Sequence, residues 1–251
     1  MQYALVDGTR CLPSPRLEGS CPSCGERAIA KCGQQKLWHW AHSAKEHCDP
    51  WWENETEWHI NWKAQFPVDR REVVHVDASS GEKHIADVKT RRGLVIELQH
   101  STMSSEEMQS REAFYDRMIW VVDGMPFSKQ FTLLTETLPS PSAEISKDIR
   151  FVKENPNIFW RISDGDSFRT LFEMHSRKEI EDEIQRTYEG HHFYKRKYRK
   201  RIWLEAKAPV FIDFGGDELL RLKTYGESRL HCVQKVEKRR LVEKNGGTYV
   251  G

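Results

Sequence analysis

Long apolar runs are missing from this sequence. No window approaches the roughly 18 consecutive apolar residues that a membrane-spanning helix needs, and the first ten residues, MQYALVDGTR, lack the apolar core of a secretory signal. Cysteine is scarce, with six residues in 251, so nothing indicates a fold held together by disulfides. We therefore expect a cytoplasmic protein that has no membrane partner.

Charge of one sign is also lacking, because 39 lysines and arginines nearly balance 38 aspartates and glutamates. With a net charge of +1, nothing global demands a nucleic-acid partner. No internal repeat is evident. A chain of 251 residues is long enough for one sizeable core or two small ones. The informative features are therefore local.

Residues 84–101, HIADVKTRRGLVIELQHS, predict two strands joined by a basic turn. Glu97 and Gln99 share one face of the second strand, whose other face is apolar, as is typical of a half-buried strand. A three-residue loop ending at Gly93 would place Asp87 directly opposite Glu97. Residues opposed in this way have Cβ atoms roughly 4.5–5.5 Å apart.

Two carboxylates this close repel each other unless a cation lies between them, so the hairpin predicts a metal site of the kind used by nucleases. A two-residue loop would instead place Asp87 opposite Ile96, on the apolar face. That register would leave a carboxylate unpaired in apolar surroundings, so we favour the first. An exposed hairpin with solvated charges is the alternative.

Residues 54–66, NETEWHINWKAQF, predict an amphipathic helix with Asn54 as its N-cap and Glu57 as the capping-box partner. Its buried stripe recurs every four residues and comprises Trp58, Trp62 and Phe66. A second set has the same spacing, runs along the edge of that stripe and comprises Glu55, His59 and Lys63. Polar groups at this edge can enter a cleft, so these three are candidate catalytic residues. A solvated helix face with ion pairs is the alternative.

The order of these elements resembles the PD-(D/E)XK nuclease core, and specifically the CoiA-like competence-protein family. The motifs that carry the resemblance are CPSCG at 21–25, WHWAHS at 38–43, ETEWHINWK at 55–63, HIADV at 84–88, IELQHS at 96–101 and REAFYDRMIWVVDG at 111–124. Together they span about half of the chain. The resemblance implies Mg²⁺- or Mn²⁺-dependent cleavage of a phosphodiester, with Asp87 and Glu97 as the catalytic carboxylates.

Gln99 stands where most members of the wider superfamily have lysine, a departure that is usual in the CoiA-like group. Lys63, His84 or Lys89 could supply the missing ammonium or its equivalent. His84 and Asp87 are separated by an odd number of positions, which places their side chains on opposite faces of a regular strand. We therefore expect His84 to be buried and hydrogen-bonded.

These residue types suit hydrolysis of a phosphodiester. Mg²⁺ takes oxygen ligands, which Asp87 and Glu97 would supply, while Gln99 would offer an amide oxygen or an amide donor. The metal generates hydroxide from bound water and stabilises charge on the scissile phosphate. His59 could orient that water or move a proton, and Lys63 could neutralise the transition state.

The N-terminal segment predicts a different metal. Cys21-x-x-Cys24 is followed, after fourteen residues, by His39-x-x-His42. Two cysteines on a knuckle and two histidines one turn apart match a closed, structural Zn²⁺ site. A redox motif is less favoured, because no βαβ pattern follows. The alternative zinc ligands are Cys32, His47 and Cys48.

Basic charge gathers at residues 191–201, HHFYKRKYRKR, where aromatic residues alternate with cations. The cations suit phosphates and the rings suit unstacked bases; a solvated helix face is the alternative. The predicted nucleic-acid contacts in this segment are Lys195, Arg196, Lys197, Arg199, Lys200 and Arg201. Arg91 and Arg92, at the hairpin tip, could also contact the DNA backbone.

We predict an α+β fold with an α/β core: a PD-(D/E)XK restriction-endonuclease-like mixed sheet flanked by helices. The predicted parts are a zinc-binding N-terminal module at 1–50, the nuclease core at 51–127, a loop or linker at 128–150, and a C-terminal α+β region for nucleic-acid or partner binding at 151–251. Further predicted elements are a helix at 104–117, a strand at 118–124, a long helix at 167–190, and two or three strands with a Gly-Gly turn at 202–225.

Three functions follow from these patterns. The favoured one is a metal-dependent DNA nuclease; RNA, DNA strandedness, and a protein partner or homodimer are left open. The second is a non-catalytic DNA- or protein-binding module on a decayed nuclease fold, which predicts gaps in the acidic set. The third is an iron enzyme using His59, His84 and a carboxylate, which requires His84 on the face of Asp87.

Overall fold

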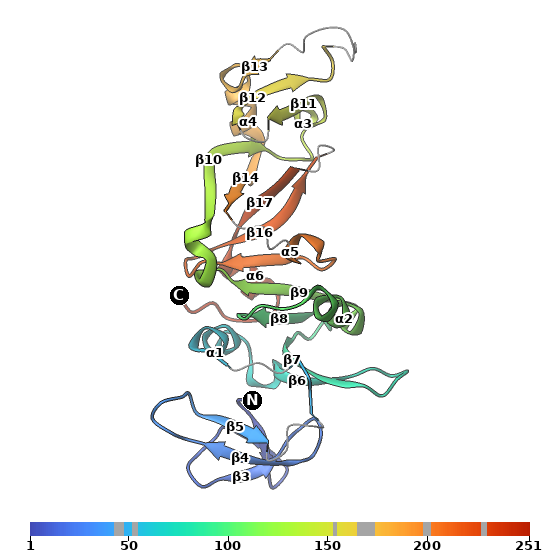
Figure 1. The fold of residues 1–251 in the computed structure, drawn as a ribbon, viewed down its shortest axis with the longest axis vertical. Helices are drawn as coiled ribbons and strands as arrows, with labels where there is room; N and C mark the ends of the chain where they lie inside the picture. Colours follow the sequence, from blue (N-terminus) through green and yellow to red (C-terminus); the bar gives the residue numbers. More distant parts are fainter. Residues whose placement is uncertain (43–47, 52–54, 153–154, 165–173, 198–201, 227–229) are drawn as a thin grey trace. The chain divides into compact units, whose positions relative to one another are not determined.

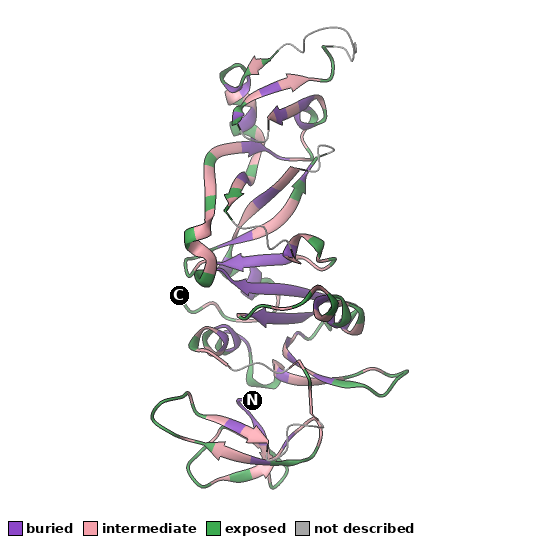
Figure 2. Cartoon of the chain, in the orientation of Figure 1, coloured by how far each residue is buried: buried purple, intermediate pink, exposed green. Residues whose placement is uncertain are grey.

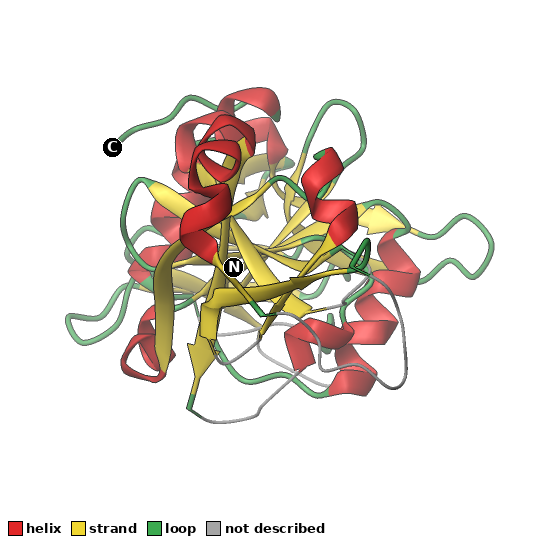
Figure 3. Cartoon of the chain, turned by 90° about the horizontal axis from the view of Figure 1, so that it is seen from above, coloured by secondary structure: helices red, strands yellow, loops and turns green. Residues whose placement is uncertain are grey.

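The computed structural model describes residues 1–42, 48–51, 55–152, 155–164, 174–197, 202–226 and 230–251 (Figure 1). The chain forms two compact units, Met1–Asp123 with Leu241–Gly251, and Gly124–Arg240. In each unit more residues lie in strands than in helices, which Figure 3 draws in yellow and red. The predicted α+β class is therefore confirmed. No helix in these described ranges is long and apolar enough to span a membrane.

The first unit begins with a five-stranded antiparallel sheet in the order β2-β1-β3-β4-β5. Its strands are β1 (Ala4–Val6), β2 (Thr9–Cys11), β3 (Glu18–Ser20), β4 (Arg27–Lys31) and β5 (His39–His42). Short strands such as these bury little by themselves. A small core of Met1, Ala4, Cys21, Ala28 and Trp40 joins them.

The same unit continues with a mixed sheet in the order β9-β8-β7-β6. Its elements are α1 (Glu57–Ala64), the 3₁₀ turn η1 (Val68–Arg70), β6 (Arg71–Val76), β7 (Lys83–Lys89), β8 (Val95–Gln99), α2 (Ser105–Tyr115) and β9 (Met118–Asp123). Strands β6, β7 and β8 are antiparallel. Helix α2 connects β8 to β9, which lie parallel. The helix predicted at 104–117 and the strand predicted at 118–124 are confirmed.

Strand β8 is buried along its whole length, as is β9 (Figure 2). The expectation of a half-buried strand was wrong, because β8 lies between β7 and β9 and parallel strands are usually covered on both faces. Glu97 and Gln99 are only 3% and 0% exposed. The polar face of this strand therefore lies inside the molecule.

Helix α1 begins later than predicted. Its N-cap is Thr56, which forms a capping box with His59. Glu57 is therefore not the capping partner, and the predicted N-cap, Asn54, lies outside the described residues. Glu55 precedes the helix instead of sharing a helical face with His59 and Lys63.

The second unit contains two antiparallel sheets. The larger has the order β10-β14-β17-β16-β15, formed by β10 (Phe131–Pro139), β14 (Tyr188–Arg196), β17 (Leu230–Glu237), β16 (Glu218–Tyr225) and β15 (Val210–Asp213). The smaller is β11 (Ile149–Val152), β12 (Asn155–Arg161) and β13 (His175–Ser176). The helical elements are η2 (Met125–Gln130), α3 (Glu144–Asp148), η3 (Arg177–Ile180), α4 (Glu181–Thr187) and α5 (Ile202–Glu205). Helix α6 (Lys238–Lys244) begins in this unit and continues into the first.

Several predictions for the second half need correction. Residues 128–150 are not a linker, since they hold β10, α3 and the start of β11. Of the long helix predicted at 167–190, residues 167–173 lie outside the described part of the chain. In the described remainder the helical segment comprises η3 and α4, because it begins at the capping box between Ser176 and Glu179 and ends where β14 begins at Tyr188. The strands predicted at 202–225 are confirmed as β15 and β16, with a helical turn before them.

Candidate active site and candidate metal centre

The β7–β8 hairpin has the predicted register. Val88 lies opposite Ile96, so the next pair along the ladder is Asp87 and Glu97. Gly93 has a φ of +77°, the left-handed conformation expected for the last residue of the three-residue loop. The turn residues therefore set which side chains of the two strands face each other.

Asp87 and Glu97 are tied together through the backbone. The Asp87 amide donates to Glu97 Oε1 at 3.3 Å, and the Leu98 amide donates to Asp87 Oδ2 at 2.9 Å. Burial, followed by repulsion from Asp87, raises the pKa of Glu97 to about 8. A buried carboxylate in this state gains from a nearby cation.

Lys63 from α1 supplies a positive charge to this region. Its Nζ lies 2.8 Å from Glu72 Oε1, 2.9 Å from Glu55 Oε1 and 4.0 Å from Asp87 Oδ1. The side chain is only 1% exposed. Burial opposes its charge, but Glu72, Glu55 and Asp87 outweigh burial and raise the pKa of Lys63. Lys63 is therefore a buried ammonium among three carboxylates.

Glu72 also belongs to this cluster, although no sequence pattern pointed to it. It lies on β6 with a φ of +44°, and its carboxylate accepts the amides of Gln2 and Tyr3. Burial opposes the charge of Glu72, but Lys63 and the neighbouring donors lower its pKa. The feature that marks Glu72 as unusual is its positive φ, which is rare for a residue other than glycine. This feature can be recognised from the structure but not from the sequence.

Glu55 is the protonatable partner of Glu72. Burial, followed by the charge of Glu72, raises the pKa of Glu55 to about 8. Among the described residues, none hydrogen-bonds to Glu55 Oε2. The side chain is 15% exposed. Glu55 can therefore hold or release a proton near neutral pH.

Arg111 is another residue that the sequence did not single out, although it lies in the REAFYDR motif. Its guanidinium contacts Glu97 Oε2 at 3.4 Å and donates to the carbonyl of Trp51 at 2.9 Å. Trp51 follows Asp49, which accepts the Ile85 amide at 2.7 Å. The 49–51 segment thus supports both β7 and the arginine that holds Glu97.

A cavity of about 320 Å³ brings these groups together. Its polar lining comprises His42, Asp49, Glu55, His59, Glu72, Asp87, Glu97 and Arg111. Lys63 does not line it but lies within 4.0 Å of three carboxylates that do. Residues that are far apart in the sequence therefore form one acidic cavity that Arg111 also lines.

Gln99 and His59 take different positions from those expected. Gln99 does not line the described cavity and donates to Ser101 O at 3.3 Å. His59 does line it, but its Nδ1 accepts the Thr56 amide at 3.2 Å as part of the helix cap. Its rotation is therefore restricted by the start of α1.

Two of the three candidates for the missing ammonium lie elsewhere. His84 is buried between Asp49 and Glu82, 2.8 Å from each, as the strand parity predicted. Lys89 Nζ lies 3.0 Å from His75 Nδ1. Of the three, only Lys63 lies beside Asp87. The iron site would need His84 beside Asp87, but His84 does not line the described cavity and both of its ring nitrogens lie beside other carboxylates.

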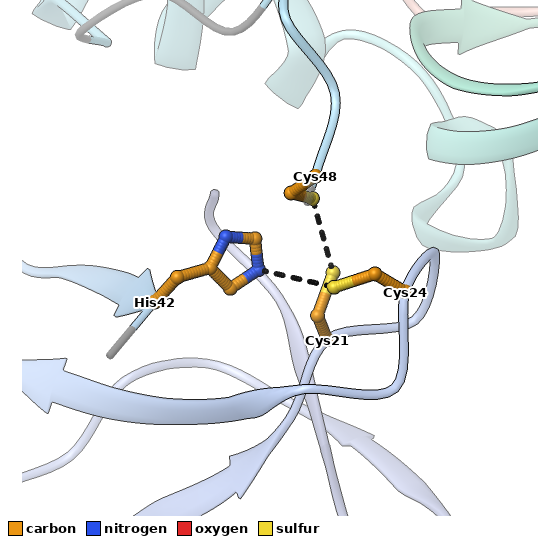
Figure 4. Close-up of side chains that lie close together, drawn as sticks. All are labelled: Cys21, Cys24, His42 and Cys48. Carbon is orange, nitrogen blue, oxygen red and sulfur yellow. Dashed lines mark hydrogen bonds between the residues drawn. The ribbon is translucent and has the colours of Figure 1, made fainter. Parts of the chain in front are cut away.

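The predicted zinc ligands are partly correct. Cys21, Cys24, His42 and Cys48 have ligand atoms that all lie within 4.8 Å of one another (Figure 4). His39 is not part of the cluster; its Nδ1 faces the Leu37 carbonyl at 2.8 Å. The two histidines lie on strand β5, where residues three apart point to opposite faces. The helical spacing assumed for them was wrong, and Cys48 completes the set.

The chemistry of this Cys₃His set fits zinc. Cys21 Sγ and Cys48 Sγ are 3.8 Å apart, and sulfur atoms around a tetrahedral zinc with bonds of about 2.3 Å lie about 3.8 Å apart. Burial, followed by the neighbouring Cys21, raises the pKa of the Cys48 thiol to about 12. A bound cation would reverse that effect.

The first part of the basic segment, residues 191–196, lies in strand β14 and not in a helix. Lys195 and Lys197 are exposed, whereas the guanidinium of Arg196 lies 4.7 Å over the Phe127 ring. Arg91 and Arg92 are exposed at the β7–β8 turn. The remaining predicted contacts, Arg199, Lys200 and Arg201, lie outside the described residues.

Residues 18–50 match the family model described as "Competence protein CoiA, N-terminal domain". The matched segment contains all four members of the Cys₃His cluster. This match supports the CoiA-like resemblance over that part of the chain. No match was found among curated proteins or among solved structures.

Proposed function

We propose that this protein is a divalent-metal-dependent nuclease of the CoiA-like kind that cleaves phosphodiester bonds of DNA. The observation that carries the proposal is that Asp87 and Glu97 face each other on neighbouring strands and line the same cavity. Lys63 Nζ lies 4.0 Å from Asp87. Carboxylates held together against repulsion are suited to binding a cation. The CoiA match to residues 18–50 favours a role in DNA processing, such as competence, recombination, a mobile element or phage defence.

The order of elements supports a PD-(D/E)XK core. Helix α1, the β6–β7–β8 meander, helix α2 and the parallel strand β9 follow the arrangement that the motifs suggested. Gln99 stands in the usual lysine position, and Lys63 offers an ammonium from α1 to the same carboxylate pair. We assign Lys63 the charge-stabilising role.

The carboxylates fit Mg²⁺ or Mn²⁺. Glu97 Oε1 and Asp87 Oδ2 accept backbone amides. Asp87 Oδ1 and Glu97 Oε2 are the oxygens that we assign to a cation, and Arg111 lies 3.4 Å from Glu97 Oε2. Such an ion, held by Asp87 and Glu97, would supply hydroxide at neutral pH and stabilise charge on the phosphate. Arg111 holds Glu97 in place, and Glu55 stores a proton at the cavity wall.

The Cys₃His cluster is proposed as a structural zinc site. All four positions are filled by protein groups, which leaves no open coordination position for catalysis. The exposed side chains of Lys195 and Lys197, with Arg91 and Arg92, are proposed phosphate contacts.

The test is cleavage of linear, circular and single-stranded DNA in Mg²⁺, Mn²⁺ or EDTA. Asp87→Asn and Glu97→Gln should lower the rate by at least about 100-fold. The matched control is Glu57→Gln, an exposed carboxylate of α1 that does not line the described cavity. Cleavage that survives both site substitutions, or persists in EDTA, would refute the mechanism.

The alternative is a non-catalytic DNA- or protein-binding module on a decayed nuclease fold. It predicts DNA binding without metal-dependent cleavage by the wild-type chain. The acidic set argues against decay, because Asp87, Glu97 and a cation beside them are all present.

A further inference from the structure

The parallel strands β8 and β9 end side by side, and each end carries a polar residue. Gln99 lies opposite Val122 in the ladder, so His100 and Asp123 form the next pair. His100 Nδ1 lies 2.7 Å from Asp123 Oδ2. The carboxyl edge of parallel strands is where α/β sheets bind their ligands. This pair therefore lies at the edge of the sheet where a ligand is expected to bind.

The pair has one buried and one accessible member. The Asp123 side chain is 6% exposed and that of His100 is 37% exposed. When Nδ1 donates to the carboxylate, the second ring nitrogen, Nε2, is the one available for chemistry. Within the described part of the chain, no residue hydrogen-bonds to Nε2 of His100. Asp123 thus orients a ring that is partly exposed to solvent.

His100 lies next to the candidate active site. Its ring centroid is 6.1 Å from that of His59, and His59 lines the cavity with Asp87 and Glu97. Glu97 lies three residues earlier, on β8, which ends one residue before His100. His59 itself is held in the α1 cap through Nδ1.

We propose that His100 is the general acid of the reaction, donating a proton from Nε2 to the leaving oxygen, and that Asp123 is its positioning residue. This assignment rests on the proposed nuclease function. Water adds its oxygen to phosphorus and loses a proton to solvent, while the bond from phosphorus to the leaving oxygen breaks. The leaving oxygen takes the Nε2 proton, and the neutral imidazole regains a proton from solvent. Asp123 accepts from Nδ1 and so fixes the orientation of the ring, which leaves the Nε2 proton for the transfer.

A leaving group that needs no proton separates this role from a structural one. The two substrates are double-stranded DNA and the p-nitrophenyl ester of thymidine 5′-monophosphate, whose nitrophenolate departs unprotonated. His100→Gln should lower kcat on DNA by about 10²- to 10⁴-fold and on the ester by less than about tenfold. Asp123→Asn should show the same selectivity. The matched control is His175→Gln, because His175 is also held by carboxylates, 2.7 Å from Asp164, but lies in the second unit.

The outcomes distinguish the two proposals. An equal loss on both substrates, or no loss on DNA, would overturn the role of His100 while leaving the nuclease intact. Absence of cleavage of either substrate by the wild type, under conditions where it binds DNA, would overturn the nuclease proposal itself. Far-ultraviolet circular dichroism and thermal melting of His100→Gln and Asp123→Asn establish that the variants are folded. If His100→Gln unfolds, the selectivity of His100→Asn decides the question.

Discussion

Lys63 illustrates how a single buried charge can hold a site together. The ammonium has contacts with Glu72 and Glu55 below 3 Å, and both carboxylates are largely withdrawn from water. Removal of one partner of such a cluster leaves the others as uncompensated buried charges. Lys63→Met should therefore destabilise the protein by about 3 to 5 kcal/mol in urea denaturation. Lys83→Met, an exposed lysine of β7, is the control and should change stability by less than about 0.5 kcal/mol. Equal effects of the two substitutions would contradict the cluster.

Glu97 gives the metal-free protein a pH dependence. Its folded-state pKa of about 8 lies above the ordinary value of 4.5, so the folded chain binds more protons than the unfolded chain between these pH values. The stabilisation is complete below pH 4.5 and is lost as pH rises through 8, by about 3 to 5 kcal/mol. Urea denaturation in EDTA at pH 5 and pH 8 should show this loss in the wild type. A Glu97→Gln protein that loses as much stability over this range would rule out the assignment.

At the scale of elements, the β7–β8 turn can be tested without touching the site. A side chain at Gly93 would meet no atom within 4 Å, but the φ of +77° is unfavourable for any residue with a Cβ. Gly93→Ala should cost roughly 1 to 2 kcal/mol in thermal or urea denaturation. Gly216 has equal space and lacks a positive φ, so Gly216→Ala is the control and should show no such loss. Destabilisation by both alike would show that conformation is not the cause.

The strand conformation of β5 predicts which of its two histidines binds zinc. Since His42 belongs to the cluster and His39 faces the Leu37 carbonyl, only one of the two histidines should matter. Purified His42→Ala and Cys48→Ser should lose most of their zinc, measured by mass spectrometry of the metal. His39→Ala should retain one zinc per chain. Retention by Cys48→Ser with loss in His39→Ala would restore the ligand set expected from the sequence.

The elements also show where sequence patterns succeed and fail. The hairpin register followed from Gly93 and from strand parity, both of which are local properties. The start of α1 could not be predicted from local properties, because Thr56 and Asn54 are both acceptable N-caps. The choice depends on the contact of the His59 side chain with the Thr56 amide. The prediction of His39 as a zinc ligand was wrong for a related reason. Two histidines three residues apart share a face in a helix but not in a strand, and the spacing alone does not show which conformation the segment adopts.

At the scale of the whole molecule, the two units should respond to pH in opposite directions. His191 on β14 is 1% exposed, and no described residue hydrogen-bonds to either ring nitrogen. Burial lowers its pKa to about 4. Because the unfolded histidine binds a proton more readily, stability of the second unit is lost as pH falls from 6.5 to 4, by about 3 kcal/mol.

Hydrogen exchange with mass spectrometry can resolve these two effects. Peptides of residues 124–240 should lose protection on acidification, and peptides of β7 and β8 should lose it as pH rises in EDTA. His191→Leu should abolish the first effect and leave the second unchanged. Uniform loss of protection across both units at acid pH would contradict the assignment to His191.

The sequence by itself determined the hairpin with its facing carboxylates, the strand parity of His84, the α2–β9 succession and the presence of a Cys- and His-rich metal set. The strands and the helix follow from side-chain periodicities of two and of about 3.6 residues, and the hairpin register follows from Gly93, which a three-residue loop requires at its last position. The metal set follows from the spacing of cysteine and histidine. Only the tertiary structure decided that Cys48 replaces His39, that Lys63 stands beside Asp87, and that Glu72, Arg111 and the His100–Asp123 pair belong to the same region. Such contacts join residues distant in the chain, and no local pattern encodes which of many charged side chains will be buried together.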